Sequence, residues 1–253
     1  MPSTSFGADI GFLGWDAEKS KDSYSLTLDG EIERGDLQKL LMKIKKKGYM
    51  PHILILTSPG GDVDEAINIG RFIRESLIYI LPGYQCLSSC FLVFVAGVDR
   101  RTGSLVELGA HRPYYDPSYF KDLTPKQAEK KQRKAMEDVS AYLREMGVAQ
   151  HIVDKIMNVP SNKLWMMSSE WYRENIGFQS AGFGEWVRAN CGEALTDQEY
   201  RDLASTDYGK KSNGFSRGYI TYLKSNWQNY NRCLSDKLDK ARKEIFNNLH
   251  YFF

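Results

Sequence analysis

The sequence predicts an α/β fold in which strands and helices alternate along the chain. His52 to Thr57 is a continuous apolar run of strand length, typical of a strand buried on both faces. A pair of glycines follows it, and Asp62 to Glu75 then repeats apolar residues at helical spacing. Two further apolar runs of strand length, at 78–81 and 104–108, continue the alternation. Such alternation is typical of βαβ units on a mainly parallel sheet.

An earlier strand and helix precede these elements. Residues 23–28 alternate polar and apolar side chains, as a half-buried strand does. Asp36 to Lys47 carries one apolar face, which predicts a helix with Asp36 as its N-cap and Gly48 as its stop. Residues 1–22 show only a weak pattern, so we take them as an N-terminal segment that precedes the domain.

The second half of the chain reads as mainly helical. Helices are predicted at 125–146, 150–159 and 169–175. After residue 180 the sequence becomes helical and aromatic, and apolar residues between Tyr230 and Leu249 step by three or four. We therefore predict a domain over 23–180 and a helical C-terminal extension over 181–253.

Composition and charge narrow the classes of partner. The 253 residues are 42% apolar and 26% charged, and Lys plus Arg minus Asp plus Glu is 34 − 32 = +2. We expect no nucleic-acid partner, because such binding relies on excess positive charge. The longest apolar run, Cys86 to Val98, is shorter than the ~18 residues of a membrane-spanning helix. The first fifteen residues contain no Lys or Arg. We thus expect neither a transmembrane segment nor a signal peptide in this chain, and a cytoplasmic protein unless a leader has been removed.

The four cysteines allow more than one arrangement. They stand at positions 86, 90, 191 and 233, and no CxxC pair occurs, so no structural zinc site is expected. Four reduced thiols and an oxidised pair such as Cys191–Cys233 both remain open. No other metal or cofactor is indicated.

Three short segments carry residue types suited to chemistry. Ser58-Pro-Gly-Gly61 is either a tight strand-to-helix turn or a source of exposed N–H groups for an anion. Ser88 and Ser89 interrupt an apolar run, as a helix cap or as a nucleophile would. His111 follows a predicted strand and is either structural or a catalytic base.

The order and spacing of these segments resemble the ClpP/crotonase superfamily, specifically the ClpP-like serine peptidases, over roughly residues 23–180. The chain is most similar to the ClpP-related proteins often predicted to be periplasmic, in which a Cys-x-Ser-x-Cys block replaces the serine block of ClpP. Cys86-Leu-Ser-Ser-Cys90 fits that block. The resemblance implies a ClpP/crotonase-type spiral of βαβ units, a periplasmic location and assembly into a homo-oligomer.

The resemblance also implies a site. Ser88 takes the position of the nucleophile and His111 that of the general base. The backbone N–H groups of Gly61 and Ser89 take the position of the oxyanion hole. These residues would hydrolyse bonds in a peptide or protein substrate by acyl transfer to serine, without a cofactor.

One part of the family pattern is missing. The stretch 158–167, where the family has its catalytic Asp, contains no carboxylate, and Asn162 is its best-placed polar residue. Asp154 lies earlier, inside a predicted helix. A Ser-His-Asn triad, a Ser-His dyad and an inactive enzyme all remain open. Two further functions also remain as alternatives, a non-catalytic binding or assembly module and an acyl-CoA-binding enzyme of the crotonase type.

Overall fold

The computed structural model describes residues 7–13, 25–115, 117–207 and 215–249. The chain divides into two compact units, Met1–Ser180 and Ala181–Phe253. The first contains a sheet and its covering helices, and the second contains helices.

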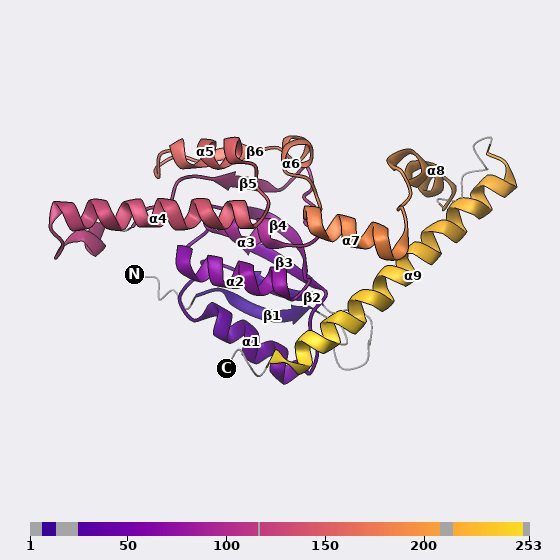
Figure 1. Cartoon of the computed structure of the whole chain (residues 1–253), viewed down its shortest axis with the longest axis horizontal. Helices are drawn as coiled ribbons and strands as arrows, with labels where there is room; N and C mark the ends of the chain where they lie inside the picture. The colour runs from indigo at the N-terminus through magenta and orange to yellow at the C-terminus, as the bar shows by residue number, and fades with distance from the viewer. Residues whose placement is uncertain (1–6, 14–24, 116, 208–214, 250–253) are drawn as a thin grey trace. The chain divides into compact units, whose positions relative to one another are not determined.

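The first unit is built on one six-stranded sheet in the order β1-β2-β3-β4-β5-β6, and Figure 1 shows the strands in this succession. The strands are β1 (Asp9–Leu13), β2 (Ser25–Asp29), β3 (Ile53–Ser58), β4 (Tyr79–Leu87), β5 (Glu107–Ala110) and β6 (Trp165–Met167). The four central strands, β2 to β5, are parallel to one another, whereas β1 and β6 pair antiparallel at the two edges. The carboxyl ends of β3, β4 and β5 therefore lie next to one another.

Helices connect the strands, as expected for βαβ units. They are α1 (Asp36–Lys47), α2 (Val63–Glu75), α3 (Cys90–Ala96), α4 (Pro125–Glu145) and α5 (Gln150–Asn158), with a short 3-10 helix at Pro117–Phe120. A further helix, α6 (Ser169–Asn175), follows the last strand. The expected α/β class is confirmed.

The core centres on α3, in which every residue is buried. The Tyr142 hydroxyl of α4 donates a hydrogen bond to the Leu92 carbonyl of α3, with a distance of 2.8 Å. Burial raises the pKa of Tyr142, so this phenol stays protonated and keeps its role as donor. Since α3 begins directly after β4, this packing fixes the chain at the end of that strand.

Several boundaries differ from the expected ones. Asp36 is the first residue of α1 rather than its N-cap, which is Gly35, and its carboxylate accepts hydrogen bonds from the Ala8 and Glu33 N–H groups. The N-terminal segment, where little pattern was expected, supplies β1. Residues 23 and 24, the start of the strand expected at 23–28, lie outside the described part of the chain. Of the expected strand 104–108, only the end belongs to β5.

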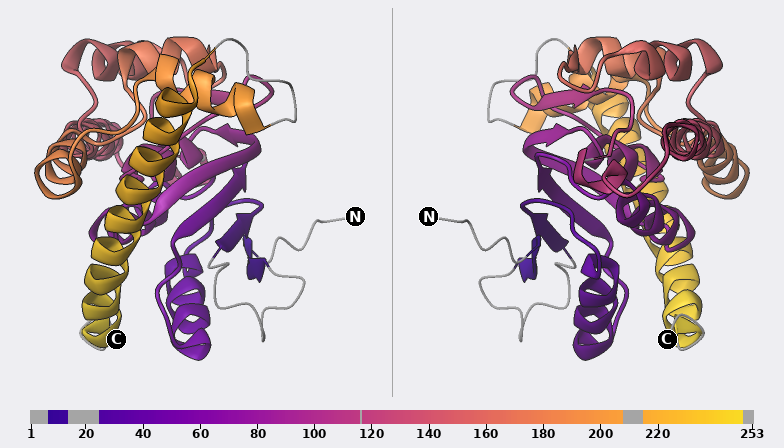
Figure 2. Two further views of the ribbon diagram at one scale, coloured as in Figure 1. Left: turned by 90° about the vertical axis from the view of Figure 1, so that its right-hand side faces the viewer. Right: turned by 90° about the vertical axis from the view of Figure 1, so that its left-hand side faces the viewer.

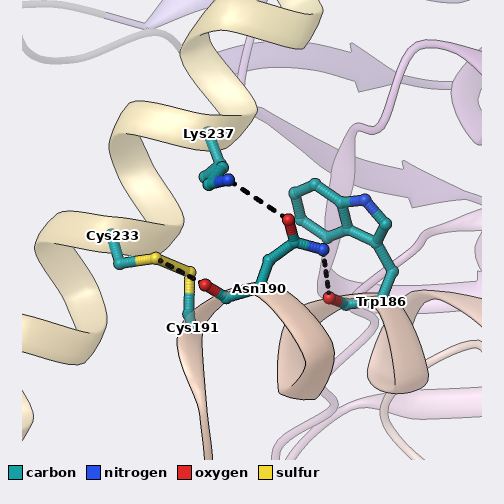
Figure 3. Close-up of a disulfide and its surroundings, with 5 residues drawn as sticks. All are labelled: Trp186, Asn190, Cys191, Cys233 and Lys237. Carbon is teal, nitrogen blue, oxygen red and sulfur yellow. Dashed lines mark hydrogen bonds between the residues drawn. A yellow bond between two sulfur atoms is a disulfide. The ribbon is translucent and has the colours of Figure 1, made fainter.

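The second unit contains α7 (Ala181–Cys191), α8 (Asp197–Asp207) and α9 (Arg217–Asn247), which confirms the helical character expected after residue 180. Figure 2 shows α9 as one unbroken helix. A disulfide joins Cys191 at the end of α7 to Cys233 on α9 (Figure 3). Beside it, Lys237 donates to the Asn190 side-chain carbonyl at 3.2 Å. None of the helices in the described ranges has the length and apolarity needed to cross a membrane.

Candidate active site

The carboxyl ends of β3, β4 and β5 border a cleft of about 990 Å³. The residues that the sequence singled out all line it, although they come from separate parts of the chain: Gly61, Ser88, Ser89, His111 and Asn162. Because parallel strands bring their carboxyl ends to one edge, the sheet topology accounts for this gathering.

Ser88 occupies a strained position at the end of β4. Its φ is 56°, and in the described part of the chain only Leu77 and Ser88 combine a side chain with a positive φ. The left-handed region is unfavourable for residues with a Cβ, so such a residue at a cleft points to a functional constraint. The Ser88 N–H donates to the Gly109 carbonyl of β5 at 2.9 Å, and its side chain is partly exposed.

The capping explanation for the two serines does not hold for their side chains. Ser89, rather than Ser88, stands at the N-cap of α3, and its hydroxyl makes no capping hydrogen bond. The Ser89 hydroxyl is buried without a hydrogen-bond partner among the described residues. Neither serine is therefore explained by helix capping.

The Ser58-Pro-Gly-Gly61 turn lies directly against Ser88. Gly60 and Gly61 have φ values of 112° and 141°, and a Cβ on Gly60 would lie 2.6 Å from the Ser88 Cβ. A side chain at Gly60 would thus collide with Ser88. The glycine is required for this close approach.

The Gly61 N–H faces away from its neighbouring chain. Gly61 forms a parallel bridge with Ile32, in which the Ile32 N–H donates to Gly60 at 2.8 Å and the Ile32 carbonyl accepts from Asp62 at 2.7 Å. Successive amides of an extended chain point in opposite directions, so the Gly61 N–H is directed to the other side. It makes no hydrogen bond within the described part of the chain. An ion pair of 3.0 Å between Arg34 and Asp62 fastens the same turn.

His111 follows β5 directly. Its Nδ1 lies 2.7 Å from the carbonyl oxygen of Arg112. A carbonyl can only accept, so Nδ1 carries a proton, and in the neutral imidazole the lone pair is on Nε2. The Arg112 N–H donates to the Val159 carbonyl at 3.2 Å, and the Pro113 carbonyl accepts from Gln132 of α4 at 2.8 Å. The loop that orients the ring is therefore held from two sides.

Asn162 lies at the rim of the cleft and is exposed. Among the described residues, no hydrogen bond joins it to His111, and none joins Ser88 to His111. Asp154 accepts from Gln150 within α5 instead of reaching the cleft. The group in contact with the imidazole Nδ1 is thus the backbone carbonyl of Arg112, which sequence reasoning missed because a main-chain acceptor leaves no residue-type signal.

Tyrosines form one wall of the cleft. Tyr114 packs beside His111 with ring centroids 5.8 Å apart, and Tyr115 lines the same space. Burial, with the carboxylates of Asp64 and Asp138, raises the pKa of Tyr115, so its phenol is a hydrogen-bond donor at neutral pH. Within the described ranges, no group of three or more His, Cys, Asp or Glu residues is placed to hold a metal ion.

A disulfide joins the two cysteines on either side of Ser88. Cys86 near the end of β4 is bonded to Cys90, the first residue of α3, and Ser88 lies midway between them. All four cysteines are paired. Of the two arrangements that the sequence left open, the structure has the oxidised pair Cys191–Cys233 and not four reduced thiols.

Comparisons with known proteins give a likeness in structure alone. No family model and no curated protein matches the sequence. Among solved structures, the chain is similar to a mutant of ClpP1 from Listeria monocytogenes, with 13% identity and a TM-score of 0.49 over 62% of this chain and 90% of that one.

Proposed function

We propose that this protein is a serine hydrolase that cleaves peptide bonds in peptides or unfolded proteins, as a ClpP-like endopeptidase does. The observation that carries the proposal is the position of Ser88. It is a strained, partly exposed serine at the end of a strand, in one cleft with His111 and with the unbonded Gly61 N–H. A left-handed serine is unfavourable for stability, whereas a nucleophile gains from being presented on such a turn.

The chemistry follows from the donors and acceptors in the cleft. His111 Nε2 accepts the Ser88 hydroxyl proton while Ser88 Oγ attacks the substrate carbonyl. The Arg112 carbonyl keeps the Nδ1 proton in place and stabilises the imidazolium. The Gly61 and Ser89 N–H groups donate to the oxyanion, and His111 then protonates the leaving amine. Water then attacks the acyl-enzyme while His111 Nε2 takes its proton; the bond from the acyl carbon to Ser88 Oγ breaks, His111 returns the proton to Oγ and the carboxylic acid leaves.

Ser88 and His111 are not hydrogen-bonded in this structure, so the first step requires a movement that brings Oγ to Nε2. Catalytic contacts often become short only when substrate binds. The open tyrosine-lined cleft has room for an extended peptide beside Gly61. Self-association, which the sequence resemblance implies, remains part of the proposal.

A fluorophosphonate probe tests the proposal without knowledge of the substrate. The Ser88 Oγ–P bond forms, the P–F bond breaks and fluoride leaves, so labelling reports an activated serine. We expect the wild type and Ser89→Ala to be labelled, Ser88→Ala to remain unlabelled, and His111→Ala to react at least about 10²-fold more slowly. Labelling that persists in Ser88→Ala would contradict the assignment.

A non-catalytic binding module is the second candidate. It is favoured by one observation, that no hydrogen bond joins Ser88 to His111 in the described part of the chain. For this candidate, the folded wild type would resist the probe while still binding an unfolded peptide. Binding that is equal in the wild type and in Ser88→Ala, with no labelling of either, would replace the peptidase with this function.

A further inference from the structure

The disulfide between Cys86 and Cys90 closes a very short loop around Ser88. The two Cα atoms are 5.2 Å apart, although four residues of extended chain span about 13 Å. Both cysteines are completely buried. The bridge therefore holds the chain reversal whose central residue is Ser88.

The position of Cys86 links this bridge to the rest of the cleft. Cys86 pairs with Ser58 of β3 on one side and with Leu108 of β5 on the other. Those strands lead into the Gly61 turn and into His111. The bridge thus ties the start of α3 to the strand that lies between the proposed oxyanion donor and the proposed base.

The strain at Ser88 gives such a restraint a role. Ser88 has a φ of 56°, and a short turn with a side chain in the left-handed region can lower its energy by rotating out of it. That rotation would move Oγ and the Ser89 N–H together, because both belong to the same turn. A covalent bond across the turn opposes this relaxation.

We propose that Cys86 and Cys90 are positioning residues for Ser88, so that the reactivity of the serine depends on their oxidation. The inference rests on the proposed function and adds a redox requirement to it. The bridge is buried, so a dithiol reductant would reach it through local opening of the turn and would then switch the site off. One of its thiolates attacks a disulfide sulfur and the S–S bond breaks. Its second thiolate then closes the reductant's own disulfide, which leaves two cysteine thiols after uptake of two protons.

The chain supplies its own matched control in the second disulfide. Cys86→Ala/Cys90→Ala and Cys191→Ala/Cys233→Ala each remove one bridge, and circular dichroism confirms whether each variant folds. We expect fluorophosphonate labelling to slow on the order of 10- to 100-fold in the first variant, because small displacements of reacting groups have effects of this size. The second variant should label within about twofold of the wild type. Reduction of the wild type with dithiothreitol should slow labelling, and reoxidation should restore it.

Hydrogen exchange separates this inference from the proposed function. Peptides that cover 87–92 should exchange faster in Cys86→Ala/Cys90→Ala than in the wild type, and at the wild-type rate in Cys191→Ala/Cys233→Ala. If the wild type resists the probe, the proposed function fails, and the exchange rates alone decide whether the bridge holds the turn. Equal labelling and equal exchange with and without the Cys86–Cys90 bridge would overturn the inference.

Discussion

Two neighbouring strand-to-helix turns in this protein achieve the same change of direction by opposite means. The turn from β3 to α2 uses glycines at positive φ, and its buried Ser58 hydroxyl is hydrogen-bonded to Gly60. The turn from β4 to α3 places Ser88 at positive φ, leaves the Ser89 hydroxyl without a partner among the described residues and adds a disulfide. The first turn places its positive φ values on glycines, where they cause little strain. The second keeps a side chain where glycine would be more stable, which points to chemistry at Ser88.

The largest expected effect is on the first turn. In Gly61→Ala, the new Cβ would lie 2.1 Å from the Ile32 carbonyl oxygen, at a φ that favours glycine. Because the neighbour is backbone, we expect a loss of about 3 kcal/mol or more of unfolding free energy in urea titrations. In Gly103→Ala, the added Cβ meets nothing within 4 Å, and stability should change by less than about 0.5 kcal/mol. Equal stability of the two variants would show that the Ile32–Gly61 approach is not as close as described.

The two disulfides should separate stability from reactivity. Their sequence separations are 4 and 42 residues. Chain entropy therefore predicts that the Cys191–Cys233 bridge contributes about 2 kcal/mol more to unfolding free energy. Urea titration of the two double-alanine variants measures this difference. Cys191→Ala/Cys233→Ala should therefore lose more stability and still keep its labelling rate. A larger loss of stability in Cys86→Ala/Cys90→Ala, with an unchanged labelling rate, would contradict the different roles given to the two disulfides.

The buried serines Ser58 and Ser89 should differ by a smaller amount in their contribution to stability. Ser58→Ala removes both hydrogen bonds to Gly60, so we expect about 1 kcal/mol of destabilisation. Ser89→Ala removes a hydroxyl that is buried without a partner, so we expect no loss of stability or a slight gain. Thermal unfolding of both variants tests this. Destabilisation by Ser89→Ala equal to that of Ser58→Ala would indicate a hydrogen bond at Ser89 that the structure does not contain.

The smallest expected effect concerns Ser88 itself. Ser88→Gly relieves the left-handed strain and should raise stability by about 0.5–1 kcal/mol relative to Ser88→Ala, while both variants lose labelling. Thermal unfolding of the pair measures the difference. If Ser88→Gly is no more stable than Ser88→Ala, the turn is not strained and the functional argument from its conformation fails.

The sequence predicted those elements that have strong periodicity. The helix α1 ends before Gly48 as expected and begins at Asp36, the residue expected as its N-cap, since its apolar face and Gly48 mark it clearly. The strand β1 was missed because its five residues lack a clear alternation. The strand expected at 78–81 runs from Tyr79 to Leu87 and so continues through Pro82 and Gly83. An irregular register between β3 and β4 accommodates them.

For the site, the sequence indicated which side chains to compare but not every contact. The residue types and spacing pointed to Gly61, Ser88 and His111, and sheet topology brings all three to one cleft. The contact between the Arg112 carbonyl and the imidazole could not be predicted from the sequence, because every residue has such a carbonyl. Spacing alone also left the Cys86–Cys90 bridge open, since residues four apart can meet in a helix as well as across a turn.

A crystal structure of the fluorophosphonate adduct would test the central claim most directly. The account predicts that phosphorus is bonded to Ser88 Oγ. It also predicts that the phosphonyl oxygen lies about 2.7–3.1 Å from the N–H nitrogens of Gly61 and Ser89, as expected for hydrogen bonds to an oxyanion. An adduct on another residue, or a phosphonyl oxygen directed away from both amides, would contradict it.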